Sequence, residues 1–132
     1  MDCIFCKIAN GEIPSFKIYE DDIVYSFLDI NPDSDGHTLI IPKKHFKDLD
    51  DIDLETLNHI NKVSKQIKKE LENKLNCVGI SLLQNNGSVQ EVKHYHLHLK
   101  PCYEGIKTIE LVKYPENIND VSEIYQKLKE NN

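Results

Sequence analysis

Residues 94–99 read His-Tyr-His-Leu-His-Leu, so three histidines alternate with one tyrosine and two leucines. Alternation with a period of two is typical of a β-strand with one buried face, because successive side chains point to opposite faces. On such a strand His94, His96 and His98 share a face, where neighbours lie roughly 6.6 Å apart. Three imidazoles at this spacing could surround one phosphate or one metal ion, although a histidine-rich, solvent-exposed face would give the same pattern.

The composition predicts a globular protein of one domain covering residues 1–132. Of these 132 residues, 39% are hydrophobic and 29% are charged, which is ordinary for such proteins. A formal net charge of −6 argues against binding to duplex nucleic acid, which needs a basic surface. No apolar run reaches the roughly 20 residues of a membrane span, and residues 1–6 do not resemble a signal peptide. We therefore expect a cytoplasmic protein without a membrane partner.

Cys3 and Cys6 form a CxxC pair close to the N-terminus, whereas Cys77 and Cys102 stand alone. Disulfides are not expected, because nothing in the sequence indicates secretion. A redox-active CxxC usually opens a helix after a central strand, and no strand precedes this one. A zinc site would need two further ligands. The pair could therefore be redox-active, metal-binding or idle.

Hydrophobic periodicity predicts an α+β fold with a mainly antiparallel sheet. The expected strands cover residues 17–20, 23–29, 37–41, 78–84, 94–99 and, late in the chain, 108–113. We expect Pro42 to end the third strand and Pro101 to end the histidine strand. The continuous apolar run in 78–84 predicts a buried strand.

Three helices are expected. A short helical turn covers residues 5–10, and an amphipathic helix covers residues 118–128. Between them, apolar residues recur every three or four positions from Leu54 to Leu75, which is the period of a helix with one buried face. Asp51 or Asp53 can cap the N-terminus of this long helix.

The histidine cluster is chemically suited to attack on phosphorus. A neutral imidazole is a good nucleophile, and with a pKa near 6.5 roughly three quarters of it is neutral at pH 7. A backbone carbonyl could hold the proton on one nitrogen of His96, so that the other presents its lone pair. His98 and His37 could contact the phosphoryl oxygens, and one of them could protonate the leaving group. Ligation of a catalytic zinc by three histidines is the competing interpretation.

Five segments form an ordered set of motifs. They are residues 3–8 (CIFCKI), 11–15 (GEIPS), 27–32 (FLDINP), 36–45 (GHTLIIPKKH) and 94–98 (HYHLH). Together they resemble the histidine triad (HIT) nucleotide-binding hydrolases, and within them the bacterial and Hint-like branch. The resemblance covers residues 1–101, about three quarters of the chain, and residues 102–132 match no motif.

The resemblance implies a HIT-like fold with a five-stranded sheet, usually in a homodimer. It also implies an enzyme that acts on nucleoside monophosphate derivatives, as a purine nucleoside phosphoramidase or a dinucleoside polyphosphate hydrolase. His96 would be the nucleophile that forms a nucleotidyl-histidine intermediate, and the His94 carbonyl would hold its tautomer. His98 and His37 would contact the phosphate or the leaving group.

The resemblance further assigns residues that bind nucleotide and metal. Asp29 would bind the ribose, and Asn85, with Asn86 as second choice, would bind the phosphate or leaving group. The other expected nucleotide contacts are Phe5, Ile8, Phe27, Ile30, Gln90 and Glu91. In many relatives two cysteines and two histidines bind one structural zinc, and the matching residues here are Cys3, Cys6, His45 and His94.

The sequence departs from the family pattern around the loop before the histidine strand. After Gly87 the loop is shorter than usual, and Val89 stands where a glycine would let the backbone approach a phosphate. Glu91 adds a negative charge that disfavours highly charged substrates. Lys100 and Cys102 also differ from the usual residues. Two alternatives follow: a nucleotide-binding sensor with little turnover, or a zinc protein that uses the histidine cluster.

Overall fold

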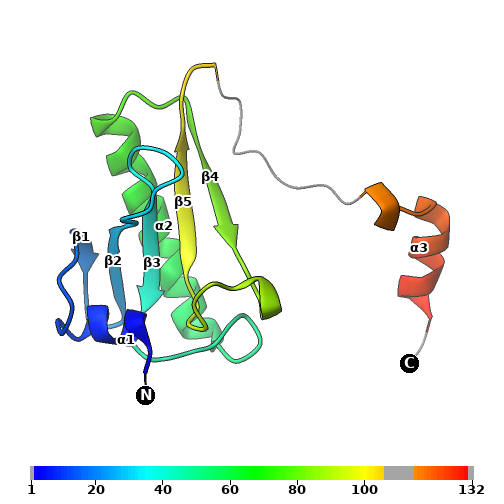
Figure 1. Ribbon diagram of the computed structural model, residues 1–132, viewed down its shortest axis with the longest axis horizontal. Helices are drawn as coiled ribbons and strands as arrows, with labels where there is room; N and C mark the ends of the chain where they lie inside the picture. Colours follow the sequence, from blue (N-terminus) through cyan, green and yellow to red (C-terminus); the bar gives the residue numbers. More distant parts are fainter. Residues whose placement is uncertain (1, 106–114, 131–132) are drawn as a thin grey trace.

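The computed structural model describes residues 2–105 and 115–130, and a five-stranded sheet forms its centre (Figure 1). The strands are β1 (Lys17–Glu20), β2 (Val24–Leu28), β3 (Thr38–Pro42), β4 (Gly79–Gln84) and β5 (Leu97–Cys102). Their spatial order is β1-β2-β3-β5-β4, and all neighbours are antiparallel. The expected α+β fold with an antiparallel sheet is therefore confirmed.

The two faces of the sheet are covered by different helices (Figure 1). Helix α2 (Leu54–Lys74) begins at Asp53, whose carboxylate accepts a hydrogen bond from the backbone N–H of Thr56. Its apolar face, centred on Ile60 and Ile67, packs against Ile40 of β3. Each such side chain contributes about 1.5–3 kcal/mol when fully buried, so this contact fixes α2 on the sheet.

The opposite face of the sheet carries helix α1 (Ile4–Ala9). Phe5 and Ile8 of α1 pack with Leu39 and Ile41, the neighbours of Ile40 on β3. Successive residues of β3 thus alternate between the two cores, as strand geometry requires. This second, smaller core holds α1 against β2 and the central strand β3.

The histidine strand differs from its expected bounds, because β5 begins at Leu97 and continues through Pro101 to Cys102. Proline lacks the N–H that a sheet ladder uses, and this was the reason to end the strand there. However, β3 pairs with β5 only as far as Leu99. The carbonyl of Pro101 accepts a hydrogen bond from Ser34 Oγ at 2.6 Å instead. The N and C=O of one residue point to the same side of a strand. The missing N–H of Pro101 therefore lies, like its carbonyl, on the side where β3 no longer pairs, and no hydrogen bond of the sheet is lost.

The expected strand in residues 78–84 is present as β4, but the prediction that it is buried is wrong. The observed β4 lies at the edge of the sheet and pairs only with β5 among the described strands. Val78 and Leu82 are exposed. A continuous apolar run arises in strands that are covered on both faces, whereas here part of the run faces outward at the edge of the described sheet.

Helix α3 (Val121–Lys129) confirms a C-terminal amphipathic helix, although Ile118 precedes it. None of its side chains is buried, and Figure 1 shows it apart from the sheet. The expected strand over 108–113 lies outside the described residues. None of the helices in the described ranges combines the length and hydropathy that a membrane span requires.

Candidate active site

His96 is held in one tautomer by the residue two positions before it. Its Nδ1 lies 2.7 Å from the backbone oxygen of His94. Because a carbonyl only accepts hydrogen bonds, Nδ1 carries the proton and Nε2 keeps its lone pair. Burial lowers the pKa of His96 below its ordinary value of 6.5, against the opposing effect of this hydrogen bond. The ring is therefore neutral at pH 7, which is the form that can attack an electrophile.

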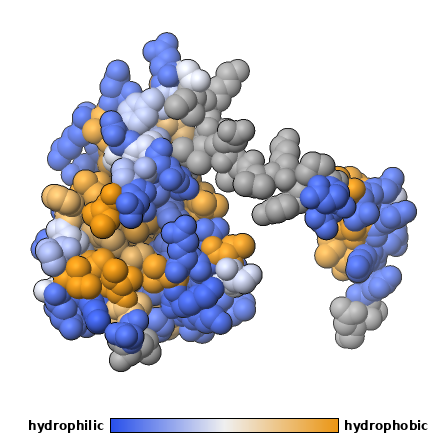
Figure 2. Space-filling view, in the orientation of Figure 1, coloured by the Kyte–Doolittle hydropathy of each residue, from blue (hydrophilic) through white to orange (hydrophobic). Residues whose placement is uncertain are grey.

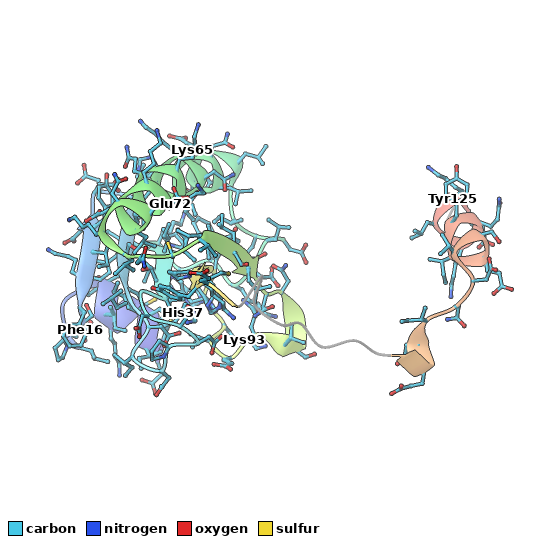
Figure 3. All side chains as sticks on the ribbon, turned by 90° about the horizontal axis from the view of Figure 1, so that it is seen from above. Phe16, His37, Lys65, Glu72, Lys93 and Tyr125 are labelled. Carbon is cyan, nitrogen blue, oxygen red and sulfur yellow. The ribbon has the colours of Figure 1, made fainter. Side chains whose placement is uncertain are left out.

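A second chain of hydrogen bonds sets the tautomers of His37 and His98. The backbone N–H of Asp33 donates to Nδ1 of His37 at 3.1 Å, so Nε2 of His37 carries the proton. This Nε2 lies 2.9 Å from Nδ1 of His98, which therefore accepts, and Nε2 of neutral His98 is left as an N–H donor. Burial lowers the pKa of His37, and it lowers that of His98 to about 3. His37 lies inside the sheet domain in Figure 3, whereas Lys65 and Glu72 lie on the outer side of α2.

Two adjoining pockets meet at His96 and His98. The first has a volume of about 250 Å³ and a largely apolar wall. The side chains that form this wall include Ile4, Phe5, Ile8, Ile13, Phe27, Ile30, Leu39 and Val92. The second has a volume of about 230 Å³, and most of its lining residues are polar or charged. One pocket thus suits an apolar ring and the other a polar or charged group.

Most of the residues expected to bind nucleotide line these pockets. Phe5 packs edge-on against both Phe27 and His96, with ring centroids 5.6 and 5.0 Å apart. Ile30 lies at the rim and is exposed. Asp29 lines both pockets, and its Oδ2 lies 3.7 Å from Nε2 of His37.

The remaining candidates for nucleotide binding lie in the loop before β5, and only some of them line the pockets. Asn85 lines the second pocket, and Glu91 lines both. Asn86 and Gln90 line neither. Asn86 accepts a hydrogen bond from the N–H of Leu49, and buried Gln90 donates to the carbonyl of Lys47. These two side chains therefore tie the loop to the segment after β3.

Lys100 and Asp33 belong to the second pocket, and neither was given a role from the sequence. Lys100 lies two residues after His98 on β5, so both side chains point to the same face. The one hint in the sequence to a role for Lys100 was that this residue departs from the family pattern. Asp33 lies in the loop between β2 and β3, and no local pattern connects it with Lys100.

Four side chains form a second cluster next to the histidines. Sγ of Cys3 and Cys6 and Nδ1 of His45 and His94 all lie within 4.8 Å of one another. The Cys6 sulfur is 3.4 Å from Nδ1 of His45 and 3.5 Å from Nδ1 of His94. Two sulfurs and two nitrogens at these separations fit a tetrahedral metal site of the kind that zinc occupies.

The protonation of this cluster also suits a metal. Nε2 of His94 lies 2.8 Å from the carbonyl of Pro42, so it carries the proton, and Nδ1 directs a lone pair into the cluster. Such a second hydrogen bond is typical of metal-binding histidines. Burial raises the pKa of the Cys6 thiol to about 11, with a further contribution from Cys3. A metal would have to displace this proton.

The three histidines of the strand do not converge on one metal ion. His94 directs its Nδ1 to Cys3, 3.4 Å away, whereas Nδ1 of His96 is occupied by a carbonyl. The interpretation of the cluster as a single three-histidine zinc site is therefore not supported. Ligand atoms of Asp29, His37 and His98 do lie within 4.8 Å of one another, but these three residues line the pocket described above.

Comparison with known proteins agrees with the motifs and the geometry. The HIT domain family matches residues 10–105. An uncharacterized HIT-like protein of Methanocaldococcus jannaschii is 47% identical over 131 residues, which are 96% of this chain and 98% of that protein. The adenosine 5′-monophosphoramidase of Candida albicans is 41% identical over 137 residues, with 97% and 90% coverage. A zinc-bound histidine triad family protein from Mycobacterium smegmatis has a TM-score of 0.78 at 36% identity, with 87% and 84% coverage. The chain belongs to the HIT domain family.

Proposed function

We propose that this protein is a nucleoside phosphoramidase that transfers the nucleotidyl group to His96 and then to water. The observation that carries the proposal is the hydrogen bond from Nδ1 of His96 to the His94 carbonyl, which leaves Nε2 unprotonated at the junction of the two pockets. The Candida albicans relative named as an adenosine 5′-monophosphoramidase supports the substrate class.

In the first step, Nε2 of His96 forms a bond to phosphorus while the bond from phosphorus to the leaving nitrogen breaks. The electron pair stays on that nitrogen, which takes a proton from water. The resulting hydroxide attacks phosphorus in the second step, and the electron pair of the phosphorus–histidine bond returns to Nε2. The N–H of His98 would donate a hydrogen bond to the transferring group, since phosphoryl transfer depends mainly on positioning and charge stabilisation.

The first pocket would hold the nucleoside. Phe5 and Phe27 offer aromatic surface to a base, and Asp29 would accept hydrogen bonds from the ribose hydroxyls. Because these contacts place the nucleoside on one side of His96, the leaving group would enter the second pocket.

The proposal predicts release of AMP from adenosine 5′-phosphoramidate, with an unusual pH dependence. Neutral His96 is the reacting form, and its pKa is lowered by burial. We therefore expect kcat/KM to stay level as the pH falls through 6.5 and to decrease only at lower pH. Release of AMP, corrected for the uncatalysed reaction, would be measured between about pH 5 and 9.

Two results would contradict this proposal. Binding of AMP without turnover of the phosphoramidate would favour the nucleotide sensor. An acid limb with its midpoint at or above pH 6.5 would show that a less buried group, and not His96 in this environment, controls the reaction.

We also propose that Cys3, Cys6, His45 and His94 hold a structural zinc ion. The lone pairs and thiols that face one another, together with the zinc-bound relative from Mycobacterium smegmatis, support this assignment. Zinc would fasten α1 and the segment after β3 to residue 94, whose carbonyl orients the nucleophile. No chemical step of the reaction passes through it.

We propose further that the protein forms a homodimer through the β4 side of the sheet. Among the described strands β4 is an edge strand, and Val78 and Leu82 expose apolar side chains there, a combination that favours contact with another chain. The exposed apolar side chains of α3 (Figure 2), among them Val121 and Leu128, would add contact area.

Light scattering after size-exclusion chromatography should give twice the mass of one chain, and Leu82→Lys should shift it toward the monomer. Phe16→Lys is the matched control, because Phe16 is also an exposed apolar residue but lies before β1. A monomeric wild type, or equal effects of the two substitutions, would contradict an interface at β4.

A further inference from the structure

Lys100 is a buried lysine in the second pocket, and among the described residues it forms an ion pair with Asp33. The residue is only 7% exposed, and its Nζ lies 2.7 Å from Oδ2 of Asp33. A buried ammonium group is costly unless it is paired. Asp33 itself is half exposed, with 53% of its side chain accessible. The partner of the buried charge is therefore well solvated, whereas the lysine has little contact with water.

The position of Lys100 places it on the side of the site where the leaving group would be. It shares a strand face with His98 and lines the second pocket together with His37 and Asn85. On the proposed function, on which this inference rests, the nucleoside occupies the first pocket. In phosphoryl transfer the attacking and leaving atoms lie roughly in line across phosphorus, so the leaving group enters the pocket that contains Lys100.

Lys100 also provides the positive charge of this pocket. Among the described lining residues of this pocket, Lys100 is the one lysine or arginine. The carboxylates of Asp29, Asp33 and Glu91 line the same space. A leaving group with one anionic group could take the place of Asp33 beside Lys100. A polyphosphate would instead bring several negative charges close to the carboxylate of Glu91.

We propose that Lys100 is a specificity-determining residue, which binds one anionic group, such as a carboxylate, on the leaving amine. Asp33 is then the resting partner that this group displaces. The substrate class becomes nucleoside phosphoramidates of amino acids and similar monoanionic amines. This goes beyond a preference for phosphoramidates in general.

Two substrates that differ in one charge test this inference. AMP joined through nitrogen to glycine carries a carboxylate, and AMP joined in the same way to glycinamide does not. In Lys100→Met we expect kcat/KM for the glycine compound to fall by about 10- to 100-fold, the size of one charge-assisted hydrogen bond. The value for the glycinamide compound should change by less than about threefold, because no anionic group is lost there.

Two further variants sharpen the test. Asp33→Asn removes the competing carboxylate but keeps the backbone N–H that orients His37, so the glycine-to-glycinamide ratio should rise. Lys100→Arg keeps the charge and should retain most of the wild-type ratio. Equal loss on both substrates in Lys100→Met, or an unchanged ratio in Asp33→Asn, would overturn the inference.

The wild type provides a measurement that does not depend on folding of the variants. A third substrate, in which AMP is joined to ethylenediamine, carries a cationic leaving group. We expect kcat/KM to decrease from glycine to glycinamide to ethylenediamine, and a preference for the cationic compound would overturn the inference. If all three compounds are cleaved at similar rates, only the role of Lys100 fails. If none is cleaved, the proposed function itself fails.

Discussion

Replacement of His96 by alanine should lower turnover of adenosine 5′-phosphoramidate by at least about 10⁴-fold, as losses of nucleophiles do in other enzymes. The reason is geometric, because His96 presents an unprotonated Nε2 where the pockets meet. His98 cannot replace it, since the hydrogen bond from His37 leaves its pocket-side nitrogen protonated. Release of AMP, followed by chromatography, measures the loss.

Binding and the covalent intermediate provide the controls for this variant. His96→Ala should still bind AMP within a few-fold of wild type in calorimetry, because the apolar pocket and Asp29 remain. After rapid quenching at alkaline pH, the mass of wild type should increase by one AMP and that of the variant should not. His59→Ala, which removes a histidine that pairs with Asp21 outside the pockets, should keep full activity. Turnover by His96→Ala near the wild-type rate would refute a covalent role for this ring.

Loss of zinc should have the largest effect on stability. In Cys3→Ser we expect the metal content to fall from about one zinc per chain to nearly none and Tm to decrease by about 10 °C or more. The cluster joins α1, the segment after β3 and residue 94, which are far apart in the sequence. Elemental analysis and calorimetric melting measure the two effects.

Cys77→Ser is the matched control, because Cys77 is a free, half-buried thiol outside the cluster. Its zinc content and Tm should stay close to those of wild type. Activity should also decrease in Cys3→Ser, since the carbonyl that orients His96 belongs to His94, a member of the cluster. Full zinc content in Cys3→Ser would show that the thiols of this cluster do not hold the metal.

Much of the site could be predicted because its signals are local. The alternation in residues 94–99 places Tyr95, Leu97 and Leu99 in the core beneath α2, and leaves the histidines for the other side. The resemblance to the HIT family predicted that Asp29 and Asn85 belong to the site, and both line the second pocket. It also predicted that Cys3, Cys6, His45 and His94 lie together. The alternation follows from side-chain type and spacing along one segment, whereas the other assignments depended on the resemblance of several separate motifs to one family.

Strand order and loop contacts were not predictable in the same way. Pro101 belongs to β5 because the neighbouring strand ends before it, and residues 78–84 lie at an edge because no further described strand pairs there. Asn86 and Gln90 hold the loop in place because their hydrogen-bond partners come from the segment after β3.

The amino-acid sequence by itself determined the two-faced strands, the long helix and the set of side chains available for chemistry, because these depend on short-range periodicity and residue type. The tertiary structure alone decided the tautomer of His98, which His37 sets, and the pairing of Lys100 with Asp33. Each of these depends on which backbone group or carboxylate lies within about 3 Å of a nitrogen atom. Such proximity arises only when loops distant in the sequence pack against the same strand.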